Sequence, residues 1–336
     1  MANQPRIFSG MQPTGELHIG NYFGALRQWV ALSKAGTHQA IFCIVDAHAV
    51  TIDYDPKEMP KRIFDTALTY LAAGIDPDSA LVFVQSDVHE QAELAWYLST
   101  VTAMGDLYRM TQFKEKSEEH KQNVNAGLLT YPVLMAADIL AYRAALVPVG
   151  NDQVQHLELS REICRKFNAR YGETFPEPQP QLSHTPRIMG LDGKTKMSKS
   201  RGNAVSLFES PASIERKIKG AFTDPDKLRK GDPGNPSICN IYTIHGAVSP
   251  SEKLAEIDQS CRAGTLGCGD CKKWLVEQLD GELTPLRRKA DELRREPGRV
   301  LQVLQTGAEN ARSIARETLV DVRRAMGLGC PTSLRG

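Results

Sequence analysis

Phe8-Ser9-Gly10-Met11-Gln12-Pro13-Thr14-Gly15-Glu16-Leu17-His18-Ile19-Gly20-Asn21 is the stretch that decides the fold of this chain. An apolar segment enters a turn rich in glycine and proline and leaves it in a helical pattern, so the stretch predicts a strand, a loop and a helix. A helix N-terminus offers unpaired N–H groups and positive potential, and Gly20 has no Cβ to keep a phosphate away. The same residues would also suit a tight turn with His18 as a helix cap, so this stretch alone leaves both interpretations open.

A second stretch lies far downstream, Lys194-Thr195-Lys196-Met197-Ser198-Lys199-Ser200. Alone, it could be a solvated run of charge. Together, the two stretches resemble the HIGH and KMSKS signatures of the class I aminoacyl-tRNA synthetases, here His18-Ile19-Gly20-Asn21 and Lys196-Met197-Ser198-Lys199-Ser200. The first signature ends in Asn21 where the class pattern has His, a departure that is familiar in the tryptophan enzymes.

The composition is that of an ordinary globular protein. The chain has 336 residues, of which 41% are hydrophobic and 24% charged, enough for a sizeable core and two domains. We see no apolar run long enough to span a bilayer, and residues 1–5 lack the features of a signal peptide, so we expect a cytoplasmic protein without a membrane segment. The net charge of +1 gives no global sign of nucleic-acid binding, although residues 201–336 are more basic than residues 1–200.

Apolar runs alternate with helical patterns in the first half of the chain. The runs at residues 40–46, 80–85 and 145–150 each end in polar residues, as buried parallel strands do. Helical patterns cover residues 57–74, 89–104, 131–144 and 152–170. This alternation predicts an α/β fold with a doubly wound parallel sheet, in which ligands bind at the carboxyl ends of the strands. The polar residues at those predicted ends are Ser9, Asp46, Gln85 and Asp152.

Two further segments have no clear pattern. Residues 108–125 are predicted to form an exposed loop, whose Lys114 or Lys116 either reaches phosphate or is simply solvated. Residues 171–186 are rich in Pro, Glu and Gln and are predicted to be a surface excursion.

Beyond residue 200 the pattern becomes helical. Helices are predicted to start at Ser210-Pro211 and at Ser249-Pro250, the latter with Glu252 as in a capping box. Amphipathic helices follow at residues 270–296 and 298–326. We therefore expect a catalytic domain at 1–200 and a smaller all-helical domain at 201–296. In the family that the chain resembles, a C-terminal helix, here within 297–336, returns to the first domain.

Asp138 is an unusual acid within the apolar run 128–140. A buried carboxylate is costly unless it is paired, so it either forms an ion pair, for example with Arg143, or accepts a hydrogen bond from a ligand N–H. The run resembles the segment that forms the amino-acid pocket of tryptophanyl-tRNA synthetases, in which the Asp accepts from the indole N–H. That resemblance implies an indole slot lined by Phe8, Tyr131, Met135 and Val149.

Asn151-Asp152-Gln153 matches the Gly-Glu-Asp-Gln motif of the same family, except that Asn151 replaces Glu. The match implies that Asp152 accepts from the ribose hydroxyls and that Gln153 holds the substrate ammonium or carboxylate. A helix cap and first turn would use the same residues for structural reasons. His156, one turn further, is expected to orient its neighbours.

Four of the seven cysteines form a pattern. Cys239, Cys261, Cys268 and Cys271 have 21, 6 and 2 residues between them, which suits structural Zn²⁺ or a 4Fe-4S cluster. Spacing alone slightly favours zinc. The pattern also resembles that of a bacterial subset of the family that carries a 4Fe-4S cluster in the anticodon-binding domain, which favours the cluster. Cys43 and Cys164 are predicted to be buried apolar fillers.

The resemblance implies a function for the whole chain. It implies activation of tryptophan with Mg-ATP, transfer to the 3′-terminal adenosine of tRNA(Trp), and a homodimer with its nucleotide-binding domains in contact. The residues implied for catalysis are Gln12, His18, Asn21, Lys196 and Lys199. The residues implied for ATP binding are Gln12, His18, Gly20, Asn21, Asp152, Lys196, Met197, Ser198 and Lys199.

Two alternatives stay open. The related tyrosyl enzymes share the fold and the reaction, and amino-acid-dependent pyrophosphate exchange distinguishes them. A paralogue that binds RNA or senses redox state would keep the fold without aminoacylation, but the retention of His18, Asp138, Lys196 and Lys199 argues against it.

Overall fold

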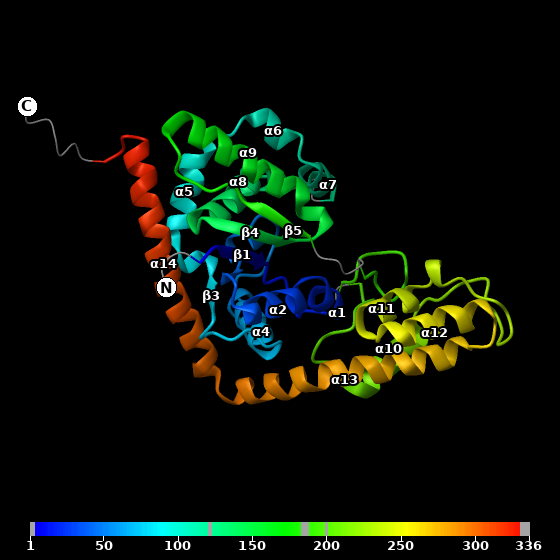
Figure 1. Ribbon diagram of the computed structural model, residues 1–336. Coiled ribbons are helices and arrows are strands. Elements are labelled where there is room, and N and C mark those ends of the chain that lie inside the picture. The colour runs from blue at the N-terminus through cyan, green and yellow to red at the C-terminus, as the bar shows by residue number, and fades with distance from the viewer. Residues whose placement is uncertain (1–3, 120–122, 183–187, 199–200, 330–336) are drawn as a thin grey trace, which may run out of the picture.

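A five-stranded parallel sheet forms the centre of the molecule (Figure 1). The computed structural model describes residues 4–119, 123–182, 188–198 and 201–329. The strands lie in the order β3-β2-β1-β4-β5, so the predicted doubly wound parallel sheet is confirmed. The strands are β1 (Arg6–Met11), β2 (Gln39–Ile44), β3 (Ala80–Val84), β4 (Ala144–Val149) and β5 (Gln179–Leu182).

The two faces of the sheet are covered by different helices. On one face Phe42 stacks on Trp29 of α2 (Arg27–Ala35), at 5.0 Å between ring centroids, and α4 (Met59–Ala72) packs beside it. On the other face Phe8 stacks on Tyr142 at 5.5 Å, under three helices (Figure 1). These are α5 (His89–Ser99), α8 (Ala126–Ala141) and α9 (Val154–Tyr171). Because strand side chains alternate between faces, a strand that is apolar throughout can serve both cores.

Short elements complete this half of the described chain. They are α1 (Ile19–Asn21), the π-helical turn η1 (Tyr22–Leu26), α3 (Asp46–Ala49), η2 (Gln85–Asp87), α6 (Met104–Tyr108), α7 (Thr111–Glu119) and η3 (Asn151–Gln153).

One sequence prediction is wrong in this half, and another missed a strand. The predicted exposed loop at residues 108–125 contains the helix α7, whose few apolar residues give it only a weak helical pattern. The predicted surface excursion at residues 171–186 contains the edge strand β5. Its sequence, Gln-Pro-Gln-Leu, has no apolar run, and pairing with β4, as in Leu146 with Gln179, makes it a strand.

The second half of the described chain is helical. Its helices are α10 (Pro211–Gly220), η4 (Pro236–Ile238), α11 (Asn240–Val248), α12 (Ser251–Arg262), α13 (Cys268–Arg295) and α14 (Pro297–Ala325). α10 begins at its proline as predicted. α12 begins one residue later than predicted, and the capping box does not form because the Ser249 hydroxyl is bonded to the His245 ring at 2.7 Å.

The last two helices join the halves. α13 lies along the helical part, and α14 turns away from it to cross β3 and α5 (Figure 1). At Gly307 a Cβ would lie 1.9 Å from the carbonyl oxygen of Val82, so only glycine lets α14 approach the edge strand this closely. No helix in the described ranges combines the length and the apolar character that a membrane span requires.

Candidate active site

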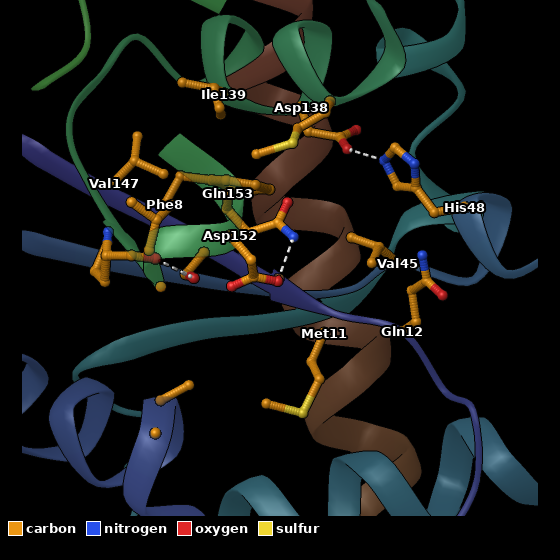
Figure 2. Close-up of a pocket in the computed structure, with 18 of the residues that line it drawn as sticks. Phe8, Met11, Gln12, Val45, His48, Asp138, Ile139, Val147, Asp152 and Gln153 are labelled. Atoms are coloured by element: carbon orange, nitrogen blue, oxygen red, sulfur yellow. Dashed lines mark hydrogen bonds and ion pairs between the residues drawn. The ribbon is translucent and has the colours of Figure 1, made fainter. Parts of the chain in front are cut away.

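A cavity of about 390 Å³ opens at the carboxyl ends of β1 and β4 (Figure 2). These strands are neighbours and run parallel, so the loops that follow them meet at one edge of the sheet. Many residues predicted for substrate binding line this cavity together, namely Phe8, Gln12, Asn21, Tyr131, Met135, Asp138, Val149, Asp152 and Gln153. Apolar residues that the sequence did not single out complete the wall, among them Met11, Val45, Ile139 and Val147.

Asp138 is the most strongly bonded side chain of the cavity. It is 2% exposed and accepts hydrogen bonds from His48 Nε2 at 2.7 Å, from Gln85 Nε2 at 2.8 and 2.9 Å, and from Gln91 Nε2 at 2.8 Å. Each carboxylate oxygen therefore accepts two hydrogen bonds. Figure 2 shows His48 reaching Asp138 at the edge of the cavity. Donors from three elements, α3, η2 and α5, stabilise this buried carboxylate.

Of the two alternatives that the sequence left open for Asp138, the ion pair with Arg143 does not form. Arg143 instead bonds Asp321 of α14 at 2.5 Å. Sequence reasoning did not find the partners His48 and Gln91. One signal was present: His48 follows the end of β2 as Gln85 follows the end of β3, and these two strands are neighbours.

Tyr131 lines the cavity, and its hydroxyl is held from behind. Its oxygen lies 2.8 Å from His156 Nε2, behind the cavity wall. Burial, and then the charge of Lys116, lowers the pKa of His156 to about 4, so this ring is neutral at pH 7. Burial raises the pKa of Tyr131 to about 12. His156 orients a neighbour, as predicted.

The unpredicted helix α7 brings a cation to the cavity. Lys116 lines it, with Nζ 4.7 Å from the centroid of the Tyr131 ring, whereas Lys114 does not line it. Of the two lysines that the sequence left open, Lys116 is therefore the one at the cavity.

Asp152 and Gln153 lie on η3, between β4 and α9. Gln153 Nε2 donates to Asp152 Oδ2 at 3.1 Å, and both side chains line the cavity (Figure 2). Neither η3 nor α9 has a side-chain cap. The alternative that these residues serve as a helix cap is therefore not supported, and both are directed at the cavity.

His18 lies where the first signature stretch meets the chain that follows the second. The His18 N–H donates to Asn21 Oδ1 at 3.1 Å, and residues 17–19 pair with residues 205–207. Burial lowers the pKa of His18, and a hydrogen bond with the backbone of Met197 opposes this shift. His18 does not line the cavity around Asp138. It lines a second, smaller cavity together with Ser206.

Residues 189–196 form a hairpin that leads into the second signature. The Gly190 N–H donates to the Thr195 carbonyl at 2.8 Å, and Met189 bridges to Lys196. Met197 is 6% exposed and packs in the core, whereas the Lys196 side chain is exposed. Lys196, Met197 and Ser198 do not line the large cavity. Lys199 lies outside the described residues.

The four patterned cysteines come from three helix ends. Cys239 precedes α11, Cys261 is in the last turn of α12, and Cys268 and Cys271 are in the first turn of α13. All four are partly buried. Burial, and then the charges of the other three sulfurs, raises the pKa of Cys271 to about 12. In the described part of the chain, no three His, Cys, Asp or Glu side chains are arranged to hold a metal ion.

The other two described cysteines, Cys43 and Cys164, are fully buried among apolar residues, as predicted.

Comparison with known proteins gives a consistent family. The family model described as tRNA synthetases class I (W and Y) matches residues 1–284. A tryptophan–tRNA ligase from Deinococcus radiodurans is 46% identical over 325 residues, covering 96% of this chain and 98% of the relative. One from Thermotoga maritima is 43% identical over 327 residues, covering 96% and 99%.

Solved structures agree with these relatives. The tryptophanyl-tRNA synthetase from Campylobacter jejuni, complexed with ADP and tryptophan, has a TM-score of 0.81 at 36% identity and covers 96% of this chain and 100% of its own. The enzyme from Mycoplasma pneumoniae has a TM-score of 0.83 at 33% identity, with 97% and 99% covered. A tyrosyl-tRNA synthetase from Archaeoglobus fulgidus, at 22% identity and a TM-score of 0.67, shares the fold.

Proposed function

The chain belongs to the class I tRNA synthetases of the tryptophan and tyrosine group, and from this membership we propose that it activates L-tryptophan with Mg-ATP and transfers it to the 3′-terminal adenosine of tRNA(Trp). The observation that carries the choice of tryptophan is Asp138. It places a buried carboxylate against an apolar cavity, where it can accept a hydrogen bond from an indole N–H.

The cavity supports separate roles for its walls. Phe8, Met135 and Val149 provide apolar surface for the indole ring. Because both oxygens of Asp138 already accept two hydrogen bonds each, the indole N–H takes the place of one of these donors when it binds. The Tyr131 ring adds to this indole slot, and Gln153 supplies polar atoms for the amino-acid ammonium or carboxylate group.

The activation step needs positioning more than proton transfer. The tryptophan carboxylate is ionised at neutral pH, so it attacks the α-phosphate without a general base, and pyrophosphate leaves. Catalysis therefore depends on holding the reactants in line and stabilising the charge that develops on the phosphates. Gln12, His18, Asn21, Lys196 and Lys199 supply donors for this task, with Gly20 leaving room for the nucleotide. Asp152 accepts hydrogen bonds from the ribose hydroxyls. Met197 and Ser198 belong to the loop that carries Lys196 to the nucleotide. Mg²⁺ enters with ATP.

The four cysteines support a bound 4Fe-4S cluster, with structural Zn²⁺ as the alternative. Burial and the neighbouring sulfurs, among them those of Cys239 and Cys268, raise the pKa values of Cys261 and Cys271, so four thiolates together need a cationic partner. A cluster there would order the loops between η4, α12 and α13. Iron and zinc content and the visible spectrum of anaerobically purified protein separate the two metals, and a protein free of both would refute the proposal.

The exposed apolar surface supports a homodimer. Trp96 is 70% exposed, Met104 55% and Tyr108 53%, and all three lie on α5 and α6 of the proposed catalytic domain, residues 1–200. A second copy of the chain could bury exposed apolar side chains such as these in an interface. The proposed helical domain, 201–296, would contact the tRNA anticodon, with the C-terminal segment 297–336 joining it to the catalytic domain. An enzyme of translation is expected in the cytoplasm.

ATP–pyrophosphate exchange with tryptophan or with tyrosine tests the proposal. Exchange that depends on tryptophan supports it, and exchange that depends on tyrosine would identify the tyrosyl alternative. A protein inactive with both amino acids would point to the paralogue that has lost aminoacylation.

A further inference from the structure

The loop that carries Lys196, residues 190–198, is called the lysine loop here. The side chain of Asn203, which lies outside both signatures, organises this loop. Asn203 is 6% exposed and lies among residues 191–198. Its Nδ2 donates to Asp192 Oδ2 at 2.9 Å, to Thr195 Oγ1 at 2.9 Å and to the Lys196 carbonyl at 3.2 Å. Its Oδ1 accepts from the Ser198 N–H at 2.8 Å. One amide thus bonds the residues on both sides of Met197, including the backbone of Lys196.

Gly190 provides the space for this amide. A Cβ at Gly190 would lie 2.0 Å from Asn203 Nδ2, a contact that no packed pair of atoms tolerates. The Gly190 carbonyl accepts from Asn240 Nδ2 of α11 at 2.9 Å, and the Leu191 N–H donates to the Asn203 carbonyl at 2.8 Å. The hairpin is therefore built around the amide and is anchored to the helical part of the chain.

Asp192 completes the frame. Its carboxylate accepts from the N–H groups of Lys194 and Thr195 at 3.0 Å and from the Thr195 hydroxyl at 2.7 Å. These hydrogen bonds, with a further one from Asn203, lower the pKa of Asp192. Asp192 shapes the turn before Lys196, and Asn203 joins that turn to the residues after it.

We propose that Asn203 is a positioning residue for ATP activation, which holds the backbone of Lys196 so that the lysine charge meets the phosphates in the transition state. This inference rests on the proposed function and adds a residue to its machinery. The Asn203 amide contacts the loop and does not line the cavity, so its effect on catalysis passes through Lys196.

Asn203→Ala tests this role. The variant loses all four side-chain hydrogen bonds, and the loop no longer holds Lys196 at one place. We expect kcat/KM for ATP in pyrophosphate exchange to fall by about 10²-fold, the effect of a misplacement of about 1 Å, while the Kd for tryptophan stays within twofold. Asn203→Ala in a Lys196→Ala background should cause no further loss, because both changes remove the same contribution.

A matched control separates positioning from general loop stability. Asn168 also ties a loop with its side-chain amide, accepting from Thr174 and Phe175 N–H groups at 3.1 Å and donating to the Phe175 carbonyl at 2.8 Å. This loop is not part of the cavity wall. Asn168→Ala should leave kcat/KM for ATP within twofold of wild type.

A second variant covers the case in which Asn203→Ala does not fold. Asp192→Asn changes an exposed side chain in the same frame and should lower kcat/KM for ATP by about tenfold, with tryptophan affinity unchanged. The inference would be overturned if Asn203→Ala kept the wild-type kcat/KM for ATP. It would also be overturned if the losses from Asn203→Ala and Lys196→Ala were additive in the double variant. A wild-type protein without tryptophan-dependent exchange would instead overturn the proposed function.

Discussion

Asp138 in the cavity and Asn203 in the hairpin each form several hydrogen bonds. The partners of the two side chains lie at very different distances along the sequence. The partners of Asp138 lie 90, 53 and 47 residues away, on α3, η2 and α5. The partners of Asn203 lie between 5 and 11 residues away. The donors of Asp138 are therefore brought together by the tertiary fold, whereas the hydrogen bonds of Asn203 are local.

This difference indicates that the cavity and the hairpin have separate functions. A network spread over several packed elements is hard to deform and suits the selection of one amino acid. A local frame that holds the backbone of an exposed lysine suits a charge that must meet the phosphates in the transition state. Changes in the hairpin should therefore reduce the activation rate, and changes in the cavity should reduce tryptophan affinity.

The largest expected effect is that of Lys196→Ala. Removing one positioned charge should lower the rate of tryptophan activation by about 10²- to 10³-fold. The Kd for tryptophan should change by less than about twofold, because Lys196 does not line the cavity. Single-turnover activation and equilibrium tryptophan binding measure the two quantities, and comparable losses in both would erase the distinction between the regions.

Asp138→Asn should give the opposite pattern. The substitution keeps the shape, removes the charge and places an NH2 group against the donors His48, Gln85 and Gln91. A buried group left without a partner costs about 1–3 kcal/mol, so KM for tryptophan should rise by about 10- to 100-fold while KM for ATP changes little. An unchanged KM for tryptophan would remove Asp138 from the pocket.

Gln91→Leu sharpens this result by leaving Asp138 in place. It removes one donor to the Asp138 carboxylate, so we expect a smaller rise in KM for tryptophan, about 3- to 10-fold. In an Asp138→Asn background the same change should have less effect, because the charge it served is gone. Additivity of the two changes would show that Gln91 acts independently of Asp138.

The smallest effect concerns pH. The folded-state pKa of His156 is lowered to about 4, below its ordinary value of 6.5, so between pH 6.5 and 4 the unfolded chain binds more protons than the folded chain. The stability that His156 contributes is present above pH 6.5 and is lost as the pH falls toward 4. Thermal melting at several pH values should show a weaker acid dependence for His156→Gln than for wild type.

A residue of the hairpin, Asp192, provides the comparison for this pH test. Asp192 also has a lowered pKa, but its side chain is exposed and solvent screens it, so Asp192→Asn should change acid stability little. If Asp192→Asn changed the acid dependence of stability more than His156→Gln, the contrast drawn between the cavity and the hairpin would be wrong.

Much of the sheet could be predicted because β2, β3 and β4 are nearly continuous apolar runs. β5 and α7 could not, because neither has an apolar pattern of its own. β5 exists through its backbone pairing with β4, and α7 packs beside α8. The consequence for the site was direct, since α7 brings Lys116 and Gln112 to the cavity wall.

The sequence by itself determined the strand, loop and helix of residues 6–35, the second signature at residues 196–200, the buried acid at Asp138 and the four-cysteine pattern, because each is encoded in neighbouring residues or in spacing. Only the tertiary structure decided which groups meet. The strand order places His48 and Gln85 beside Asp138, and α14 takes Arg143 away to Asp321. A buried carboxylate requires donors, but the chain offers many, and the packing of distant elements selects among them.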